Sequence, residues 1–114
     1  MAYTTIDKPT DYFNTVLYTG NGSTNAITGV GHQPDFTWIK RRDSTGDNGL
    51  YDSVRGALKR LQSNENSAEA TTADSLTAFG TDGFTMGSNA SYNGSSNTYA
   101  SWNWKAGTSF SNDA

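Results

Sequence analysis

The residues most able to do chemistry are a histidine, a loop rich in oxygen-bearing side chains, and three tryptophans. His32 is the single histidine of the 114-residue chain, and no motif such as Gly-x-Ser-x-Gly surrounds it. A general base needs an orienting partner and a nucleophile or substrate within reach. We therefore interpret His32 as a turn or surface residue, not as a catalytic base.

Oxygen donors gather in the loop at residues 43–49, where Asp43, Asp47 and Asn48 could ligate Ca²⁺. The spacing does not match an EF-hand loop, whose twelfth position is a bidentate acid. Asp, Asn, Ser and Gly are also the ordinary residues of turns. A turn is therefore the favoured interpretation, and we expect no cofactor.

Acidic pairs are the second kind of catalytic group to consider. Glycoside hydrolysis needs two carboxylates that face one cleft, roughly 5–10 Å apart. The acids of this chain fall mostly in turns and loops, and no predicted strand places two of them on a common face. We therefore expect a protein that is not an enzyme.

Aromatic residues make up 12% of the chain. Trp102 and Trp104 are two residues apart, so they share one face of a strand with small alanines beside them. Such a face could stack on sugars, but it is also typical of a sandwich core. We predict a core that contains Phe36, Trp38, Phe84, Trp102 and Trp104. The candidate contacts with a ligand or partner are then four tyrosines in loops or outward positions: Tyr18, Tyr51, Tyr92 and Tyr99.

Short strands between turn signals must position these side chains. Alternating or β-branched and aromatic stretches predict strands at 12–18, 26–28, 36–42, 50–55, 58–62, 75–79, 84–86 and 99–106. Residues 63–74 are polar and lack an apolar stripe, so we favour a surface loop there, with a helix of one or two turns as the alternative. This pattern predicts an all-β, antiparallel β-sandwich of the jelly-roll or concanavalin-like kind, with little or no helix. A small barrel is the alternative.

Composition narrows the classes of function. The formal net charge of −3 argues against a nucleic-acid binder. Apolar runs of only a few residues are far shorter than the roughly 20 that span a bilayer, so we expect no membrane insertion. There is no cysteine, which excludes disulfides and thiolate metal sites. No basic-then-apolar leader is visible, so we expect synthesis in a cytoplasm.

Six short segments, taken in order, resemble a domain that recurs in virion proteins of tailed phages, especially marine phages and cyanophages. The segments are Tyr18–Ser23, Ile27–Gly31, Pro34–Lys40, Asp52–Gly56, Asp82–Gly87 and Trp102–Gly107. The resemblance extends over residues 12–107, nearly the whole chain. Relatives of this kind are often longer, with further β-domains after the Trp-Lys-Ala segment.

The resemblance implies a SPRY-like or concanavalin-like sandwich in a virion protein, such as a capsid decoration, fibre or tail-associated module. It implies partners among other virion proteins, several symmetric copies and a location on the virion. It supplies no catalytic residue. We divide the chain into an N-terminal arm (1–11), a sandwich domain (12–107) and a C-terminal tail or linker (108–114). The alternative hypothesis is a carbohydrate-binding module for host surface glycans.

Overall fold

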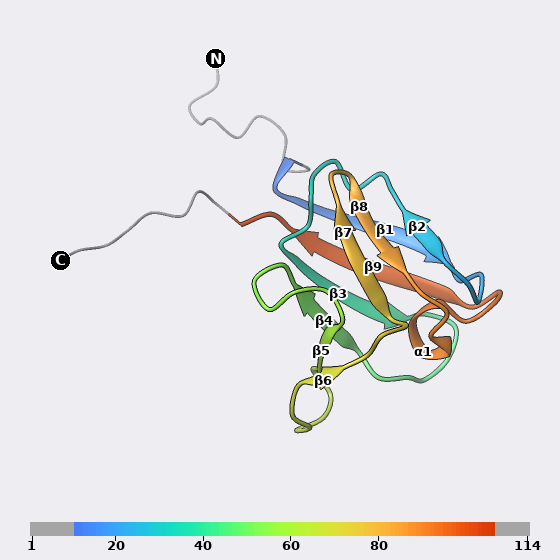
Figure 1. The fold of residues 1–114 in the computed structure, drawn as a ribbon. Coiled ribbons are helices and arrows are strands. Elements are labelled where there is room, and N and C mark those ends of the chain that lie inside the picture. Colours follow the sequence, from blue (N-terminus) through green and yellow to red (C-terminus); the bar gives the residue numbers. More distant parts are fainter. Residues whose placement is uncertain (1–10, 107–114) are drawn as a thin grey trace, which may run out of the picture.

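Alternation of large and small side chains builds two antiparallel sheets, which the computed structural model describes over residues 11–106 (Figure 1). The larger sheet contains, in spatial order, β1 (Phe13–Thr19), β9 (Thr98–Trp104), β3 (Phe36–Arg41), β4 (Gly49–Asp52), β5 (Lys59–Gln62) and β6 (Ala70–Thr71). The smaller sheet contains β2 (Asn25–Ile27), β8 (Gly83–Met86) and β7 (Leu76–Gly80). A short helix, α1 (Ala90–Asn93), precedes β9.

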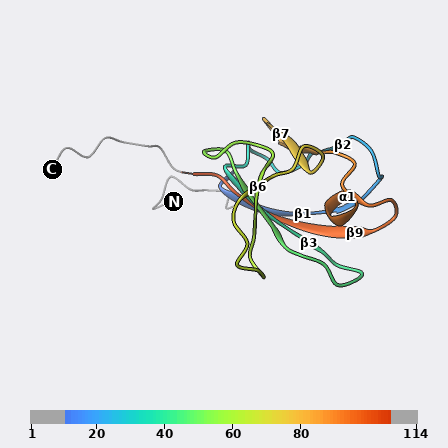
Figure 2. The same cartoon turned by 60° about the horizontal axis from the view of Figure 1, so that its bottom comes forward.

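The smaller sheet and α1 lie on one side of the larger sheet, as Figure 2 shows edge-on. Residues that are directly opposite in an antiparallel pair share a face. Tyr18 is opposite Tyr99, and Val16 is opposite Ser101, so these residues of β1 and β9 form the inner face. On β3, Thr37 and Ile39 continue that face. The neighbouring residues of each strand point to the outer face.

The core between the sheets is built from aliphatic and tyrosine side chains. Its buried members are Ile27, Ile39, Tyr51, Leu76, Phe84, Met86, Tyr92 and Tyr99, with Val16, Tyr18, Ala57 and Phe79 packed against them. Tyr18 stacks on Tyr99 with ring centroids 5.1 Å apart. Tyrosines therefore fill space that aliphatic residues occupy in most cores.

Hydroxyl groups of the core tyrosines hold α1 in place. The Tyr18 hydroxyl donates to the carbonyl oxygen of Tyr92 at 2.7 Å. The Tyr99 hydroxyl donates to the carbonyl oxygen of Ala90 at 3.2 Å and accepts from the Gly94 N–H at 2.9 Å. These bonds satisfy backbone groups of a helix too short to satisfy its own.

Buried Asn93 ties the end of α1 to the turn after β1. Its side-chain amide donates to the carbonyl oxygens of Gly87 at 2.8 Å and Ser23 at 2.6 Å. Its side-chain oxygen accepts from the Asn21 N–H at 3.2 Å. Gly20 is required in this turn, because a Cβ there would lie 2.1 Å from the carbonyl oxygen of Gly94.

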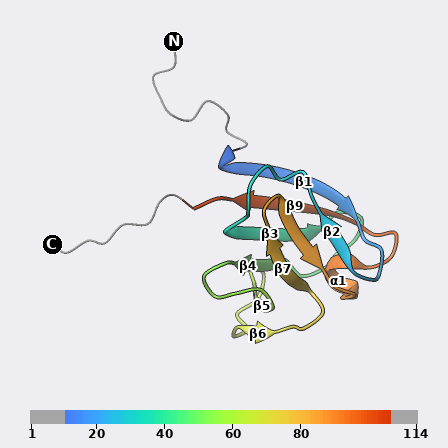
Figure 3. The same cartoon turned by 45° about the horizontal axis from the view of Figure 1, so that its top comes forward.

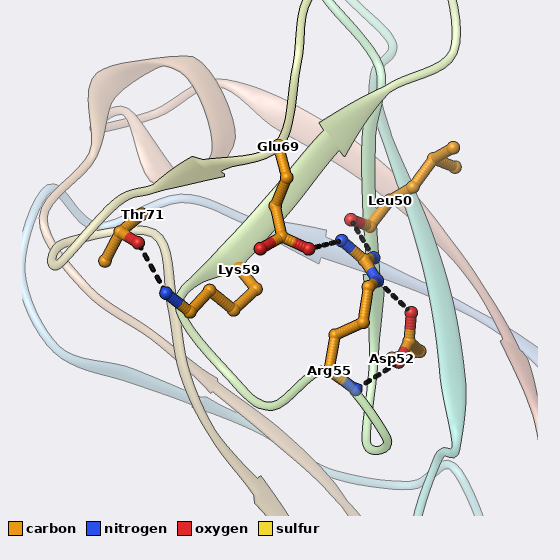
Figure 4. Close-up of polar contacts among 6 residues, drawn as sticks. All are labelled: Leu50, Asp52, Arg55, Lys59, Glu69 and Thr71. Atoms are coloured by element: carbon orange, nitrogen blue, oxygen red, sulfur yellow. Dashed lines mark hydrogen bonds and ion pairs between the residues drawn. The ribbon is translucent and has the colours of Figure 1, made fainter.

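A charged turn joins β4 to β5 (Figure 4). The Asp52 carboxylate accepts from the N–H of Arg55 at 2.7 Å and also pairs with its guanidinium group. The same guanidinium reaches Glu69 at 3.0 Å and the carbonyl oxygen of Leu50 at 3.3 Å. One arginine therefore fastens the turn to both the preceding strand and the approach to β6.

The prediction of an all-β antiparallel sandwich with little helix is confirmed. Two local predictions are wrong. The strand expected at 50–55 ends at Asp52, because Asp52 and Arg55 close a turn there. The polar loop expected at 63–74 contains β6, which pairs with β5. Residues 1–10 of the predicted arm and the tail at 108–114 lie outside the described residues.

Candidate functional site

The outer face of the larger sheet carries a continuous group of aromatic side chains. Trp104 of β9 lies directly opposite Phe13 of β1 on one side and Phe36 of β3 on the other. Trp102 lies opposite Trp38 of β3. We call these five residues, Phe13, Phe36, Trp38, Trp102 and Trp104, the aromatic face.

The rings of the aromatic face contact one another but are tilted. The Trp104 ring lies 5.0 Å from Phe13 and 5.1 Å from Phe36, with interplanar angles of 48° and 56°. Trp38 and Trp102 are 5.9 Å apart at 58°. Tilted contacts of this kind are favourable between aromatic rings. They give a ridged surface, not a flat stack.

Solvent reaches this surface. Phe13 and Trp104 are each 37% exposed, and Leu17, four residues from Phe13 on the same face of β1, is 55% exposed. Phe36, Trp38 and Trp102 are half-buried. Figure 2 shows that β2, β7 and α1 pack on the opposite side of the sheet. Within residues 11–106, no second layer of secondary structure lies over the aromatic face.

A shallow recess of about 230 Å³ lies within the aromatic face, and its lining residues are Trp38, Lys40, Trp102 and Trp104. Three indole rings therefore accompany one ammonium group. A recess of similar size, about 250 Å³, lies on the smaller sheet between residues 26–28 and 80–85, but its lining holds no tryptophan or tyrosine. The recess on the aromatic face is therefore the one of these two that offers indole rings to a ligand.

The prediction that Phe36, Trp38, Trp102 and Trp104 form the core is wrong, although Phe84 is buried as predicted. Alternation placed Trp102 and Trp104 on one face correctly, but it does not say which face points inward. The inward residues of β9 include Ser101 and Asn103, whose polar groups find partners. Ser101 Oγ donates to the carbonyl oxygen of Val16 at 2.9 Å, and Asn103 Oδ1 accepts from Thr37 Oγ1 at 3.0 Å.

The prediction that the four tyrosines are exposed contacts is also wrong. Tyr51, Tyr92 and Tyr99 are fully buried, and Tyr18 is partly buried against Tyr99. Burial, the largest cause, raises the pKa of the Tyr18, Tyr51 and Tyr92 phenols above the ordinary value. The four tyrosines therefore belong to the interior of the fold, where the tryptophans were predicted. The tryptophans lie at the surface, where the tyrosines were predicted.

Of the three residues considered as Ca²⁺ ligands, Asp43 and Asp47 have other partners for their carboxylates, and Asn48 is bonded through its backbone N–H. The Asp43 carboxylate pairs with Arg41 at 2.6 Å, and this bond holds the pKa of Asp43 below its ordinary value. Asp47 accepts from the Asn64 side chain at 2.8 Å, and the Asn48 N–H donates to the same side chain at 3.0 Å. In residues 11–106, no three His, Cys, Asp or Glu residues cluster as metal ligands would.

His32 belongs to a turn, as predicted, but it is buried and not on the surface. The turn is held by Asp82, whose carboxylate accepts from the N–H groups of Gly29 at 3.0 Å and Gly31 at 2.7 Å. These hydrogen bonds lower the pKa of Asp82. Asp82 therefore joins the segment that contains His32 to the β7–β8 hairpin.

Sequence reasoning missed two members of this surface, Phe13 and Leu17. Both are in β1, where Phe13, Thr15 and Leu17 alternate with Asn14 and Val16. That alternation was available in the sequence, but it carries meaning only once β1 is known to pair with β9. Lys40 lies on the same face of β3 as Phe36 and Trp38.

Comparison with known proteins gives a family but no annotated relative. The profile of a family described as a domain of unknown function, DUF7483, matches residues 8–114. Comparison with curated proteins finds no match, and comparison with solved structures finds none either. Over residues 11–106, no helix has the length and apolar content that a membrane crossing requires.

Proposed function

This chain belongs to the DUF7483 family, and we propose that it is a non-enzymatic structural module of a phage particle, as a capsid decoration, fibre or tail-associated protein. It docks to another virion protein through the aromatic face. The phage context is supported by the six ordered segments in the sequence. The docking surface is supported by the arrangement of side chains on the larger sheet.

The observation that carries the proposal is the exposure of Trp104, Phe13 and Leu17 on a sheet face without a second layer in residues 11–106. Contiguous exposed apolar patches on a protein mark interaction sites more often than chance surface. Tryptophan is enriched among the residues that dominate binding energy at protein interfaces. A partner that covered these rings would remove a large apolar area from water.

The six segments themselves serve the architecture. Gly83 of Asp82–Gly87 packs so tightly that a Cβ would lie 1.9 Å from the carbonyl oxygen of Ile27. Asp52–Gly56 forms the turn fastened by Arg55. Trp102–Gly107 contributes two rings to the aromatic face. The segments therefore support a shared scaffold, and the last of them also supplies the proposed contact.

The test is incorporation into particles. Mass spectrometry of purified particles from the phage that encodes the chain should detect it at a fixed copy number. Trp104→Thr, which keeps a strand-forming residue, should fold normally but lose incorporation. Ala78→Thr on exposed β7 of the smaller sheet is the matched control and should incorporate like the wild type. Absence of the wild-type chain from particles would overturn the proposal.

A carbohydrate-binding module is the second candidate, and the recess among Trp38, Trp102 and Trp104 favours it. Sugars need hydrogen-bonding partners for their hydroxyls, because polar groups that lose water without replacement cost free energy. Apart from the three tryptophans, the lining of the recess contains only Lys40, whose ammonium group can form hydrogen bonds. The apolar character of this lining therefore suits a protein partner better. A glycan array, with and without Ca²⁺, separates the two: specific binding that Trp38→Ala abolishes would favour the sugar.

A further inference from the structure

Strand β1 forms one edge of the larger sheet and pairs on one side, with β9 (Figure 3). The Lys105 N–H donates to the carbonyl oxygen of Tyr12 at 2.7 Å. Backbone groups alternate in direction along an antiparallel strand, so Asn14 and Val16 also direct theirs toward β9. The N–H and C=O groups of Phe13, Thr15 and Leu17 therefore point away from β9.

Among residues 11–106, no backbone group pairs with the outward edge of β1 over these three residues. No strand among residues 11–106 lies in the larger sheet beyond β1. At the end of the strand, the outward carbonyl oxygen of Thr19 accepts from the Asn25 side chain at 3.2 Å. A row of outward N–H and C=O groups is the template on which another extended strand adds.

The edge also lacks the usual protection against such pairing. Proteins commonly block an edge strand with charged residues, proline or a bulge. Residues 13–19 read Phe-Asn-Thr-Val-Leu-Tyr-Thr, with no charge, proline or glycine. Their register with β9 runs without interruption from Phe13 to Thr19. β1 is therefore a regular edge that is open to a partner strand.

The side chains of β1 are complementary to a second copy of the same strand. Its two exposed large apolar residues, Phe13 and Leu17, are equally spaced about Thr15 and share the outer face. An antiparallel pair with its twofold axis at Thr15 places Phe13 opposite Leu17 of the partner subunit, and the reverse. Cross-strand pairs of an aromatic and an aliphatic residue stabilise sheets.

We propose that two copies of this chain associate through antiparallel pairing of β1 with β1, with the twofold axis at Thr15. All three outward-facing residues then exchange backbone hydrogen bonds with the partner subunit, as in an isologous interface. Two larger sheets become one continuous sheet. This association does not rest on the proposed function, although it joins the two aromatic faces side by side into one larger surface.

Cysteine cross-linking tests the register. Opposite residues in a hydrogen-bonded antiparallel pair have Cα atoms about 5.5 Å apart, within the range of a disulfide. The chain has no cysteine, so Thr15→Cys can form disulfides only between chains. Mild oxidation should convert Thr15→Cys to a covalent dimer much faster than Ser44→Cys, an equally exposed control in the loop after β3. A mixture of Phe13→Cys and Leu17→Cys chains should cross-link faster than either variant alone.

Sedimentation of the full chain provides the independent measurement. The wild type should sediment as two chains, and Thr15→Lys as one, because two ammonium groups would lie directly opposite each other. The melting curve of Thr15→Lys, followed at low concentration, should match the wild type, since Thr15 is exposed in the single chain. A wild type that stays a single chain at high concentration, with Thr15→Cys no faster than Ser44→Cys, would overturn the proposal. A dimer that Thr15→Lys leaves intact would overturn it as well.

Discussion

Tyr18 of β1 stacks on Tyr99 of β9, with ring centroids 5.1 Å apart and an angle of 17° between the ring planes. The pair lies on the inner face, while Leu17 and Ala100, their neighbours in the same strands, lie on the outer face. The tyrosines therefore fill the interior and the tryptophans remain at the surface. The core can be tested through the chemistry of the phenol groups.

Alkaline pH should unfold the protein. Burial raises the pKa of Tyr18, Tyr51 and Tyr92 in the folded chain, whereas the unfolded chain has phenols near a pKa of about 10. The fold favours the neutral phenol, so this stability is complete below pH 10 and is lost as the pH rises above it. Tyrosinate absorbance and circular dichroism should change in one cooperative step. Gradual ionisation near pH 10 with an unchanged dichroism spectrum would contradict a tyrosine core.

Removing the hydroxyl of Tyr99 should destabilise the fold. Tyr99→Phe leaves the buried Gly94 N–H without its acceptor and the Ala90 carbonyl without this donor. We expect a loss of about 1–3 kcal/mol in the free energy of unfolding, measured by urea titration. Tyr12→Phe is the control, since Tyr12 is exposed, and should change it little. Equal effects of the two variants would show that the Tyr99 hydroxyl does not hold α1.

Gly20 and Gly83 should not tolerate replacement by a residue that has a side chain. A Cβ at Gly83 would lie 1.9 Å from the carbonyl oxygen of Ile27, and a Cβ at Gly20 would lie 2.1 Å from that of Gly94. Each alanine variant must move backbone, so we expect each to lose about 3 kcal/mol of stability. At Gly46 the nearest atom to a Cβ is 3.9 Å away, so Gly46→Ala should stay within about 0.5 kcal/mol of the wild type. Thermal melting of the three variants distinguishes these outcomes.

Acid should weaken the turn that holds His32. Hydrogen bonds from Gly29 and Gly31 lower the pKa of Asp82 in the folded chain. The stability that they provide is present above the unfolded pKa of about 3.9 and is lost as the pH falls through the folded value. Asp82→Asn should lower the melting temperature at neutral pH, and the difference from the wild type should shrink below pH 4. Glu65→Gln, in the exposed loop before β6, should show no such trend.

The sequence was sufficient to predict the fold class, because strand alternation and turn residues act locally. Trp102 and Trp104 were placed on one face of one strand, as the structure has them. The strands predicted at 75–79 and 84–86 are present as β7 and β8, which pair across the short turn between Gly80 and Gly83. Each of these features depends on residues close together in the chain.

The direction of each face could not be predicted in the same way. Whether Trp102 or Ser101 points inward depends on partners that are distant in sequence. One of them is Val16, 85 residues away, whose carbonyl oxygen accepts a hydrogen bond from the Ser101 hydroxyl. The tryptophans were therefore assigned to the core from the aromatic and alanine pattern of one strand face, which does not fix its direction. The candidate site was found only when pairing of β1, β9 and β3 brought Phe13, Trp104 and Phe36 into one row.

Oxidative footprinting of the tryptophans tests the docking claim most directly. Hydroxyl radicals applied to the free chain and to intact particles report, by mass spectrometry, how far solvent reaches each ring. We predict that Trp102 and Trp104 are modified in the free chain and protected in the particle, while Val54, which is 93% exposed, is modified in the free chain and serves as the internal reference. Equal modification of Trp104 in the free chain and in the particle, relative to the rest of the chain, would contradict docking through the aromatic face.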